Sequence, residues 1–238
     1  MSNDTQPDQQ PIKQPDQQQI KQPDHQQIKQ PAQQPVYKKL PEDFYLNNDV
    51  VSTARSLLGC RLWTRINNTV TAGIIAETEA YDGLTDRASH AYGGRRTPRT
   101  EIFYHPGGVA YTYLCYGIHT LFNVITGEKD MPGAILIRAV APCEGIGTIL
   151  QRRRQAQLSR NTSGGPGLVT RALGITMSHN GTSLNRDTIW ITGAIAVETP
   201  AADDVLAGPR VGVGYAGEDA SLPWRFRIRN SPFTSPAK

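Results

Sequence analysis

The stretch from 109 to 126, VAYTYLCYGIHTLFNVIT, decides the class of fold. β-branched and aromatic residues crowd both of its halves, and such residues favour strands. Tyr116-Gly117 interrupts the run, so the pattern predicts a β-hairpin with its tip at these two residues. Because side chains alternate along a strand, Tyr111 and Tyr113 share one face, while Tyr116 lies an odd number of residues away at the tip.

Further strands are predicted on both sides of this hairpin. RLWTRI (61–66) and TVTAGIIAETEA (69–80) flank Asn67-Asn68, and asparagine tolerates the left-handed backbone of a tight turn. This pattern predicts a second hairpin. Additional strands are expected in AILIRAV (134–140), DTIWITGAIAVE (187–198), RVGVG (210–214) and RFRIRN (225–230).

Fewer segments have apolar residues at the spacing typical of a helix. A helix is expected over 50–58, with Asn48 as its N-cap and Gly59 as its stop, and others in EGIGTILQRRRQA (144–156) and SGGPGLVTRALGI (163–175). The segment 81–99 reads as a loop or short helices. Strands outnumber helices without a βαβ rhythm, so we expect an α+β fold: a single domain on a curved antiparallel or mixed sheet, with flanking helices and a protruding β-hairpin.

The N-terminal region is an eight-residue repeat. QPDQQPIK, QPDQQQIK, QPDHQQIK and a degenerate QPAQQPVY occupy residues 6–37. The repeat has too few apolar side chains to offset the entropy of ordering it, so residues 1–37 are predicted to be a disordered tail rich in glutamine and proline. Residues 38–238 are predicted to form the folded domain.

Composition restricts the functional classes. The chain carries a net charge of +4, and the tail holds three lysines against four aspartates, so the domain is slightly more basic than the whole. An anionic partner is compatible with this balance. The sequence contains neither a membrane-spanning run nor a signal peptide, so membrane association and secretion are not expected. Three scattered cysteines indicate reduced thiols inside a cell, with no zinc or iron–sulfur site and no cofactor.

AETEAYDG (76–83) is the first candidate for chemistry. Glu77, Glu79 and Tyr81 share one face of a strand, and a carboxylate held by a rigid strand suits a general base. The alternative is an ordinary strand whose solvent face carries two glutamates. The residues alone do not distinguish Glu77 from Glu79.

RASHAYGGRRTPR (87–99) is the second candidate. Four arginines and paired glycines are typical of a loop that contacts phosphates, although they also suit a solvated loop. The aromatic hairpin could stack a base on one tyrosine and fill a gap in a helix with another, or simply place tyrosines in a core. SGGPG before a helix could bind an anion or merely begin that helix.

Taken in order, ETEAY, SHAYGGRRTPR, YTYLCYGIHTLFNV, ILIRAV, SGGPGLVTRALGI and RVGVGYAGE with PWRFRI resemble the alkyladenine (3-methyladenine) DNA glycosylase family. The resemblance runs from about 43 to about 233. It implies that Glu79 is the general base that activates the attacking water. It also implies that Arg138 and the backbone carbonyl of Val213 help to hold that water.

The resemblance assigns further residues to binding. Tyr81, His90 and Tyr113 correspond to the wall around a flipped base, and Asn123 to the residue that disfavours guanine. Tyr116 corresponds to the residue that enters the minor groove. Phosphate contacts are expected from Arg95, Arg96 and Arg99.

The implied activity is that of a monofunctional DNA glycosylase of base excision repair. It acts on double-stranded DNA as a monomer, removes alkylated or deaminated purines of the 3-methyladenine, 7-methylguanine and hypoxanthine class, and leaves an abasic site. A lyase activity is not expected, because none of the lysines after residue 37 lies in a segment that the resemblance assigns to the pocket. The protein is expected in the cytoplasm or nucleoid of a bacterium, or in a eukaryotic nucleus. A non-catalytic nucleic-acid-binding domain and a hydrolase of free nucleosides are the alternatives.

Overall fold

The computed structural model describes residue 1, residues 37–194 and residues 199–235. The predicted tail therefore lies outside the described residues, apart from its two end residues, Met1 and Tyr37. The division of the chain at residue 38 stays a prediction. Tyr37 packs against Trp63 with ring centroids 5.6 Å apart, and the guanidinium of Arg61 lies 4.1 Å from the centre of its ring.

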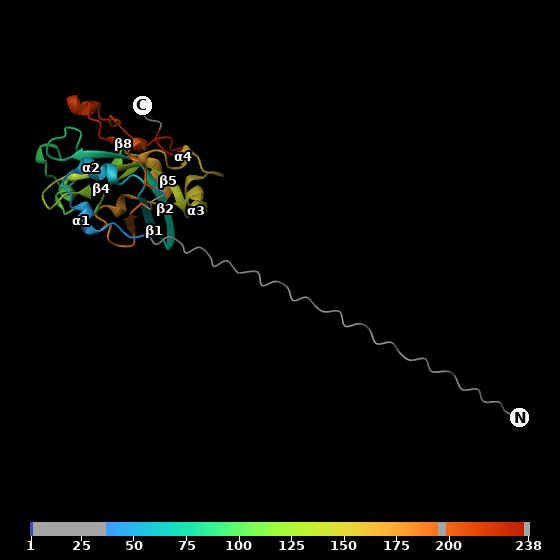
Figure 1. Cartoon of the computed structure of the whole chain (residues 1–238). Helices are drawn as coiled ribbons and strands as arrows, with labels where there is room; N and C mark the ends of the chain where they lie inside the picture. Colours follow the sequence, from blue (N-terminus) through green and yellow to red (C-terminus); the bar gives the residue numbers. More distant parts are fainter. Residues whose placement is uncertain (2–36, 195–198, 236–238) are drawn as a thin grey trace. The chain divides into compact units, whose positions relative to one another are not determined.

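The described residues form one eight-stranded antiparallel sheet (Figure 1). Its main path runs in the order β3-β4-β5-β2-β1-β6, while β8 pairs with β2 and β7 pairs with β8. The strands are β1 (Arg61–Ile66), β2 (Thr69–Asp82), β3 (Ala110–Cys115), β4 (His119–Thr126), β5 (Gly133–Glu144), β6 (Ile189–Thr192), β7 (Val205–Gly208) and β8 (Arg225–Ile228). The sheet and its helices confirm the predicted α+β class.

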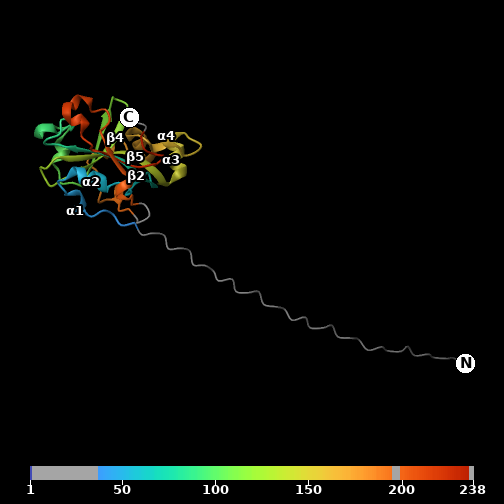
Figure 2. The ribbon, with the colours of Figure 1, turned by 45° about the horizontal axis from the view of Figure 1, so that its top comes forward.

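Short helices surround the sheet. α1 (Glu42–Tyr45) and α2 (Val50–Ser56) lie together on the left in Figures 1 and 2, whereas α3 (Ile146–Arg153) and α4 (Arg160–Ser163) lie together on the right. α5 (Pro166–Leu173) packs against β4 and β5. Short 3-10 helices are η1 (Tyr92–Gly94), η2 (Glu101–Tyr104), η3 (Met177–His179) and η4 (Ala202–Asp204), and η5 (Gly214–Ser221) is a longer one with a kink at Gly217. None of the helices within the described residues is long and apolar enough to span a membrane.

The cap of α2 differs from the prediction. Asp49, and not Asn48, is the N-cap, because its carboxylate accepts hydrogen bonds from the amides of Val51 and Ser52. The side chain of Asn48 instead accepts a bond from the amide of Glu128 and so holds a different loop. The helix begins at Val50 as predicted, but it ends at Ser56 with Leu57 as its C-cap, before the predicted stop at Gly59.

Both predicted hairpins are confirmed. Asn67 and Asn68 have φ values of 51° and 59°, the left-handed geometry of a tight turn whose twist matches the strands. Tyr116 and Gly117 have φ values of 50° and 72° at the tip of the β3–β4 hairpin. Tyr116 is 88% exposed, which indicates that this tip protrudes.

RVGVG (210–214) was predicted to be a strand, and this prediction is wrong. Residues 209–213 form an irregular loop after β7, and Gly212 adopts a φ of 75°. The amide of Val211 donates to a side chain of β2 and not to a sheet neighbour. A valine-rich segment thus leaves the sheet because its backbone hydrogen bonds are made elsewhere.

β2 is the central strand for function. Its first half pairs with β1, its second half pairs with β8, and β5 runs along its other edge. Glu77 and Glu79 lie in the second half, between β5 and β8, and neither has any exposed surface. The reading in which these glutamates occupy a solvent face is therefore wrong.

Candidate active site

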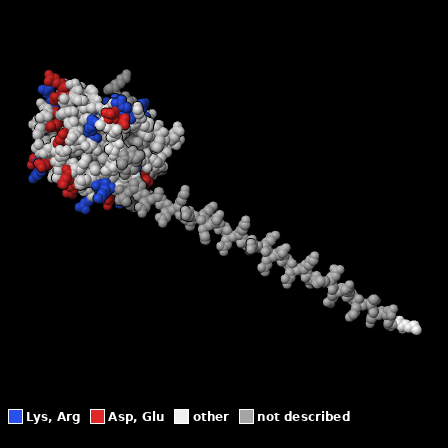
Figure 3. Space-filling model, viewed as in Figure 1, with Lys and Arg blue, Asp and Glu red and all other residues white. Residues whose placement is uncertain are grey.

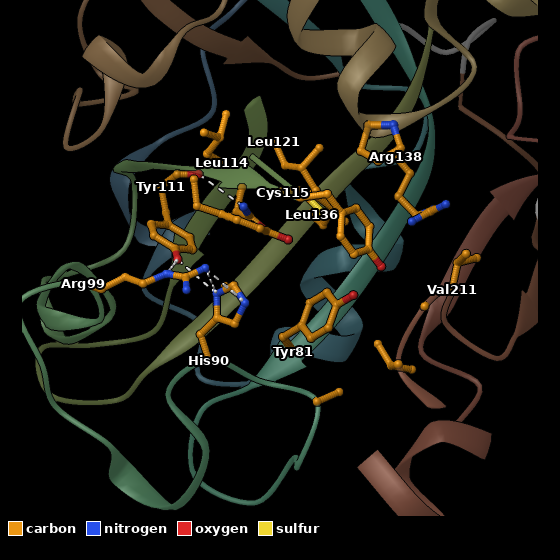
Figure 4. Close-up of a pocket in the computed structure, with 18 of the residues that line it drawn as sticks. Tyr81, His90, Arg99, Tyr111, Leu114, Cys115, Leu121, Leu136, Arg138 and Val211 are labelled. Carbon is orange, nitrogen blue, oxygen red and sulfur yellow. Dashed lines mark hydrogen bonds between the residues drawn. The ribbon is translucent and has the colours of Figure 1, made fainter. Parts of the chain in front are cut away.

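A cavity of about 460 Å³ opens between the β3–β4 hairpin and the loop that follows β7. This volume is within the usual range of small-molecule sites. β2, β3, β4 and β5 contribute its floor and walls, and Val211, Gly212 and Val213 contribute the opposite side. Figure 4 shows His90, Arg99 and Tyr111 on one side of the cavity, and Arg138 and Val211 on the other.

One wall is aromatic. Tyr111 and Tyr113 stack with ring centroids 5.4 Å apart and an interplanar angle of 24°, as expected for alternate residues on one face of β3. His90 meets Tyr113 edge-on at 4.8 Å. Arg99 places its guanidinium 5.3 Å from the centre of the Tyr113 ring, which is a cation–π distance. The wall therefore offers flat rings together with polar edges.

His90 is neutral at physiological pH in this wall. Burial, followed by the nearby charge of Arg99, lowers the pKa of His90 to about 4. Its Nδ1 lies 3.0 Å from the hydroxyl of Tyr111, and that hydroxyl also accepts a bond from Nε of Arg99. A neutral imidazole in these contacts can present one donor and one acceptor, but it carries no charge.

Asn123 forms part of the cavity floor. It lies on β4 directly opposite Tyr111, is 4% exposed, and donates from Nδ2 to the backbone carbonyl of Tyr111 at 3.2 Å. Because the backbone fixes this amide, its side chain presents a rigid polar group to anything that enters the cavity. Asn123 lines the cavity, and its role in binding stays a prediction.

Glu79 lies immediately behind the cavity wall and does not line it. Its carboxylate accepts hydrogen bonds from the Tyr81 hydroxyl at 2.8 Å, from Nη1 of Arg138 at 3.2 Å and from the Val211 amide at 2.7 Å. All three donors belong to residues that line the cavity. A carboxylate accepts about four hydrogen bonds, so these three donors leave capacity for one more.

The charges around Glu79 are balanced by arginine. Burial disfavours the charged guanidinium of Arg138, but Glu79 and Glu77 outweigh it and raise the pKa of Arg138. Burial and the charge of Glu79 also raise the pKa of Tyr81 well above its ordinary value. At neutral pH, Arg138 therefore stays charged. The Tyr81 hydroxyl stays protonated and donates a hydrogen bond to Glu79.

Glu77 has a different environment, although it is only two residues away. Its carboxylate contacts Nε of Arg138 at 3.0 Å and Nε of Arg225 at 3.1 Å, and it accepts two hydrogen bonds from Ser235. Three of these four contacts reach Oε1 and one reaches Oε2, and two of the partners, Arg225 and Ser235, do not line the cavity. All three donors to Glu79, in contrast, belong to residues that line the cavity, and the choice of Glu79 as the general base stays a prediction.

The loop 209–213 is anchored by a buried ion pair. Arg210 donates to both carboxylate oxygens of Asp86, and both side chains have no exposed surface. The guanidinium of Arg210 also lies 4.8 Å from the centre of the Tyr81 ring. The carbonyl of Val213 accepts a bond from the amide of Ala216 at 2.9 Å, and its second lone pair remains available.

The predicted phosphate contacts separate into two groups. Arg99 lines the cavity, and with Arg87 and Arg95 it also lines a second hollow of about 420 Å³ beside it. Arg96 points elsewhere: its guanidinium pairs with Glu101 at 2.6 Å and with Asp130 at 3.0 Å. Its charge is therefore already balanced, whereas Arg95 and Arg99 are exposed at the hollow.

Several site residues were missed from the sequence alone. Val211 supplies the amide that contacts Glu79, Tyr215 lines both hollows, and Ser235 contacts Glu77. For Val211, the only signal in the sequence was its place in the glycine- and valine-rich segment RVGVG. Within residues 37–194 and 199–235, no group of three acidic, histidine or cysteine residues is arranged to hold a metal ion.

The described residues thus combine an α+β domain, an aromatic cavity, a buried carboxylate behind it and an exposed tyrosine at a protruding tip. Residues 43–232 match the profile of the family described as Methylpurine-DNA glycosylase (MPG). The chain belongs to this family.

Similar proteins occur in several bacteria. A Chlamydia felis protein is 46% identical over 190 residues, which cover 79% of this chain and 95% of that protein. A Bacillus licheniformis protein is 43% identical over 201 residues, which cover 84% of this chain and 98% of that one. A Chlamydia pneumoniae protein is 42% identical over 190 residues, covering 79% and 94%. Each of the three bears the name "Putative 3-methyladenine DNA glycosylase".

Proposed function

We propose that this protein is a monofunctional DNA glycosylase that flips an alkylated or deaminated purine into the cavity and hydrolyses its N-glycosidic bond. The observation that carries the proposal is the position of Glu79, a buried carboxylate with unused acceptor capacity behind a cavity walled by stacked tyrosines. The names of the relatives point to 3-methyladenine as one substrate.

The flipped base occupies the space between Tyr81 and Tyr113. Both rings line the cavity, so a planar purine can stack against aromatic faces on entering it. Asn123, fixed by the Tyr111 carbonyl, crowds the exocyclic amine that distinguishes guanine from hypoxanthine and adenine lesions. His90, which is neutral here, contributes a hydrogen bond at the edge of the site without adding charge.

The hydrolytic step uses Glu79 as general base. A water that enters between Tyr81 and Val211 gives its proton to Glu79, and its oxygen bonds to the anomeric carbon of the sugar. The bond from that carbon to the base breaks, and the base leaves with the electron pair. Arg138 and the Val213 carbonyl hold the water in place, and a general base contributes roughly 10²–10⁴-fold to such a step.

The charge of the lesion decides how readily it leaves. A purine alkylated at N3 or N7 already carries a positive charge, so it departs as a neutral base without an acid. Hypoxanthine is neutral and needs protonation to leave as easily. Both lesions pair and stack poorly, which lowers the energy needed to flip them.

The surface around the cavity fits a DNA backbone. Tyr116 is the most exposed of the described tyrosines and fills the space vacated by the flipped base. Arg95 and Arg99 contact phosphates beside the lesion, whereas Arg96 contributes less because two carboxylates already pair with it. On the face shown in Figure 3, basic and acidic side chains are interspersed.

The product is an abasic site in an intact strand. Backbone cleavage by glycosylases proceeds through a Schiff base to an amine. Among the described residues that line the cavity, there is no lysine. The enzyme acts as a monomer on double-stranded DNA, in the cytoplasm or nucleoid of a bacterium.

The test is base release from a duplex that carries one hypoxanthine and, separately, from alkylated DNA. We expect free base to appear while the strand stays intact until alkali cleaves it. Borohydride added during turnover should trap no covalent complex. A trapped complex contradicts the monofunctional assignment, and binding of both substrates without any release favours a non-catalytic DNA-binding domain.

A further inference from the structure

We propose that Glu77 and Ser235 form a clamp that positions the catalytic carboxylate of Glu79 through Arg138. This inference rests on the proposed function and deepens it. It assigns a role in the reaction to a residue near the C-terminus of the chain, far in sequence from the residues that line the cavity. Glu77 and Ser235 are positioning residues, because neither lines the cavity.

The clamp consists of short, buried contacts. The amide of Ser235 donates to Oε2 of Glu77 at 2.6 Å, and its hydroxyl donates to Oε1 at 2.7 Å. The two residues are 158 positions apart in the sequence. Glu77 is fully buried and Ser235 is 5% exposed, so water does not compete for these bonds. The C-terminal segment is thereby fastened beneath the active site.

Arg138 connects the clamp to the cavity. Its Nε donates to Oε1 of Glu77 at 3.0 Å, while its Nη1 donates to Oε2 of Glu79 at 3.2 Å. One guanidinium is thus divided between two carboxylates. Nη2 of Arg138 also reaches the hydroxyl of Ser235 at 3.4 Å, so both members of the clamp orient the same guanidinium.

This division matters for the chemistry. Arginine and a carboxylate prefer a bidentate pairing, in which two N–H groups occupy both oxygens. If Arg138 turned fully toward Glu79, its second donor would take the acceptor capacity that the three present donors leave open. Glu77 prevents this turn by holding Nε. Glu79 therefore keeps one acceptor site open for a hydrogen bond from the attacking water.

The clamp is also balanced in charge. Arg225 contacts Glu77 through Nε at 3.1 Å, so two glutamates and two arginines share the buried cluster. Removing Glu77 leaves an excess of buried positive charge, which strongly destabilises the folded state. Ser235 offers a milder test, because its hydroxyl can be deleted without changing the charge of the cluster.

The experiment measures single-turnover excision and DNA affinity separately, in point variants of the full-length chain and in two C-terminal truncations. Ser235→Ala removes the hydroxyl contacts with Glu77 and Arg138 but keeps the amide bond to Glu77. A chain that ends at Thr234 removes both bonds to Glu77 and also places a terminal carboxylate beside it, so Ser235→Ala is the decisive variant. The matched controls are Thr234→Ala, whose hydroxyl donates to the carbonyl of Ser231 in its own turn, and a chain that ends at Pro236. Ser235→Thr keeps both donors and serves as the rescue.

We expect the excision rate to fall about ten-fold in Ser235→Ala and about 100-fold in the chain ending at Thr234, because small misplacements of catalytic groups cost up to about 10² in rate. Affinity for the same duplex should not change, and the controls and Ser235→Thr should stay near wild type. A purely structural role would lower thermal stability and the active fraction but leave the rate per active site unchanged.

The outcomes separate this inference from the proposed function. Release of base by the wild type, with undiminished rates in Ser235→Ala and the chain ending at Thr234, overturns the clamp and leaves the glycosylase assignment intact. Rate and affinity that fall together also overturn it. No release of base by the wild type from either substrate overturns the proposed function and this inference with it.

Discussion

The backbone amide of Val211 donates a 2.7 Å hydrogen bond to Oε1 of Glu79, a residue 132 positions earlier in the chain. This bond joins the loop that follows β7 to the central strand of the sheet. It exists because Gly212, with a φ of 75°, turns the chain immediately after Val211. The conformation of one loop therefore contributes to the environment of the proposed general base.

Gly212→Ala tests this relationship. A side chain in the left-handed region costs about 1–2 kcal/mol, and the loop can relieve that strain by moving the Val211 amide away from Glu79. We expect lower stability together with a drop of about ten-fold in single-turnover excision. Gly214→Ala is the matched control, because a Cβ there meets open space. Equal rates in the two variants contradict the role of the loop.

Sequence patterns predicted the local features of this site well. Both hairpins depend on residues adjacent in sequence: asparagines that accept positive φ, and strand formers on either side of Tyr116-Gly117. The alternation rule also placed Tyr111 and Tyr113 on one face, where they stack. These features follow from short-range sterics, so a single chain suffices to find them.

The choice between Glu77 and Glu79 could not be made in this way. The proposed choice rests on the partners of the two carboxylates: Glu77 contacts Arg225 and Ser235 from the far end of the chain, whereas Glu79 contacts residues that line the cavity. The strand predicted at RVGVG was wrong for a related reason, since the Val211 amide finds a carboxylate and not a strand neighbour. Both depend on partners that are distant in the sequence, and no local pattern encodes them.

Tyr116 is expected to act on base flipping and not on folding. Tyr116→Ala should lower excision from a paired duplex by at least about ten-fold, with a smaller effect on a lesion that is already unpaired, because an unpaired base costs less to flip. Stability should change little, since the ring is 88% exposed. Tyr116→Phe keeps the ring and should retain most activity. Equal losses on paired and unpaired lesions argue against the wedge role.

The buried pair Asp86–Arg210 should make a large contribution to stability. Asp86→Asn leaves the fully buried guanidinium of Arg210 without its counter-charge, which costs about 3–5 kcal/mol. Glu101→Gln is the comparison, because it breaks an ion pair to Arg96 whose side chains are about half exposed. Urea unfolding of both variants should show a large loss only for Asp86→Asn. Similar midpoints would show that Arg210 is not effectively buried.

His90 should make stability depend on pH in mildly acidic solution. Its folded pKa of about 4 lies below the ordinary value of about 6.5, so the unfolded chain binds a proton more readily. The stability linked to neutral His90 is fully present above pH 6.5 and is lost as the pH falls toward 4. Urea unfolding at pH 7 and pH 4.5 should show a smaller decrease for His90→Gln than for wild type. His105→Gln, at an exposed position, should follow the wild type.

Single-turnover base release by Glu79→Gln, measured beside wild type on a hypoxanthine duplex and on alkylated DNA, tests the central claim most directly. The account predicts that wild type releases the free base, whereas Glu79→Gln binds the same duplex with similar affinity and releases base at least about 10²-fold more slowly. Release by Glu79→Gln at the wild-type rate would contradict the assignment of Glu79 as the general base.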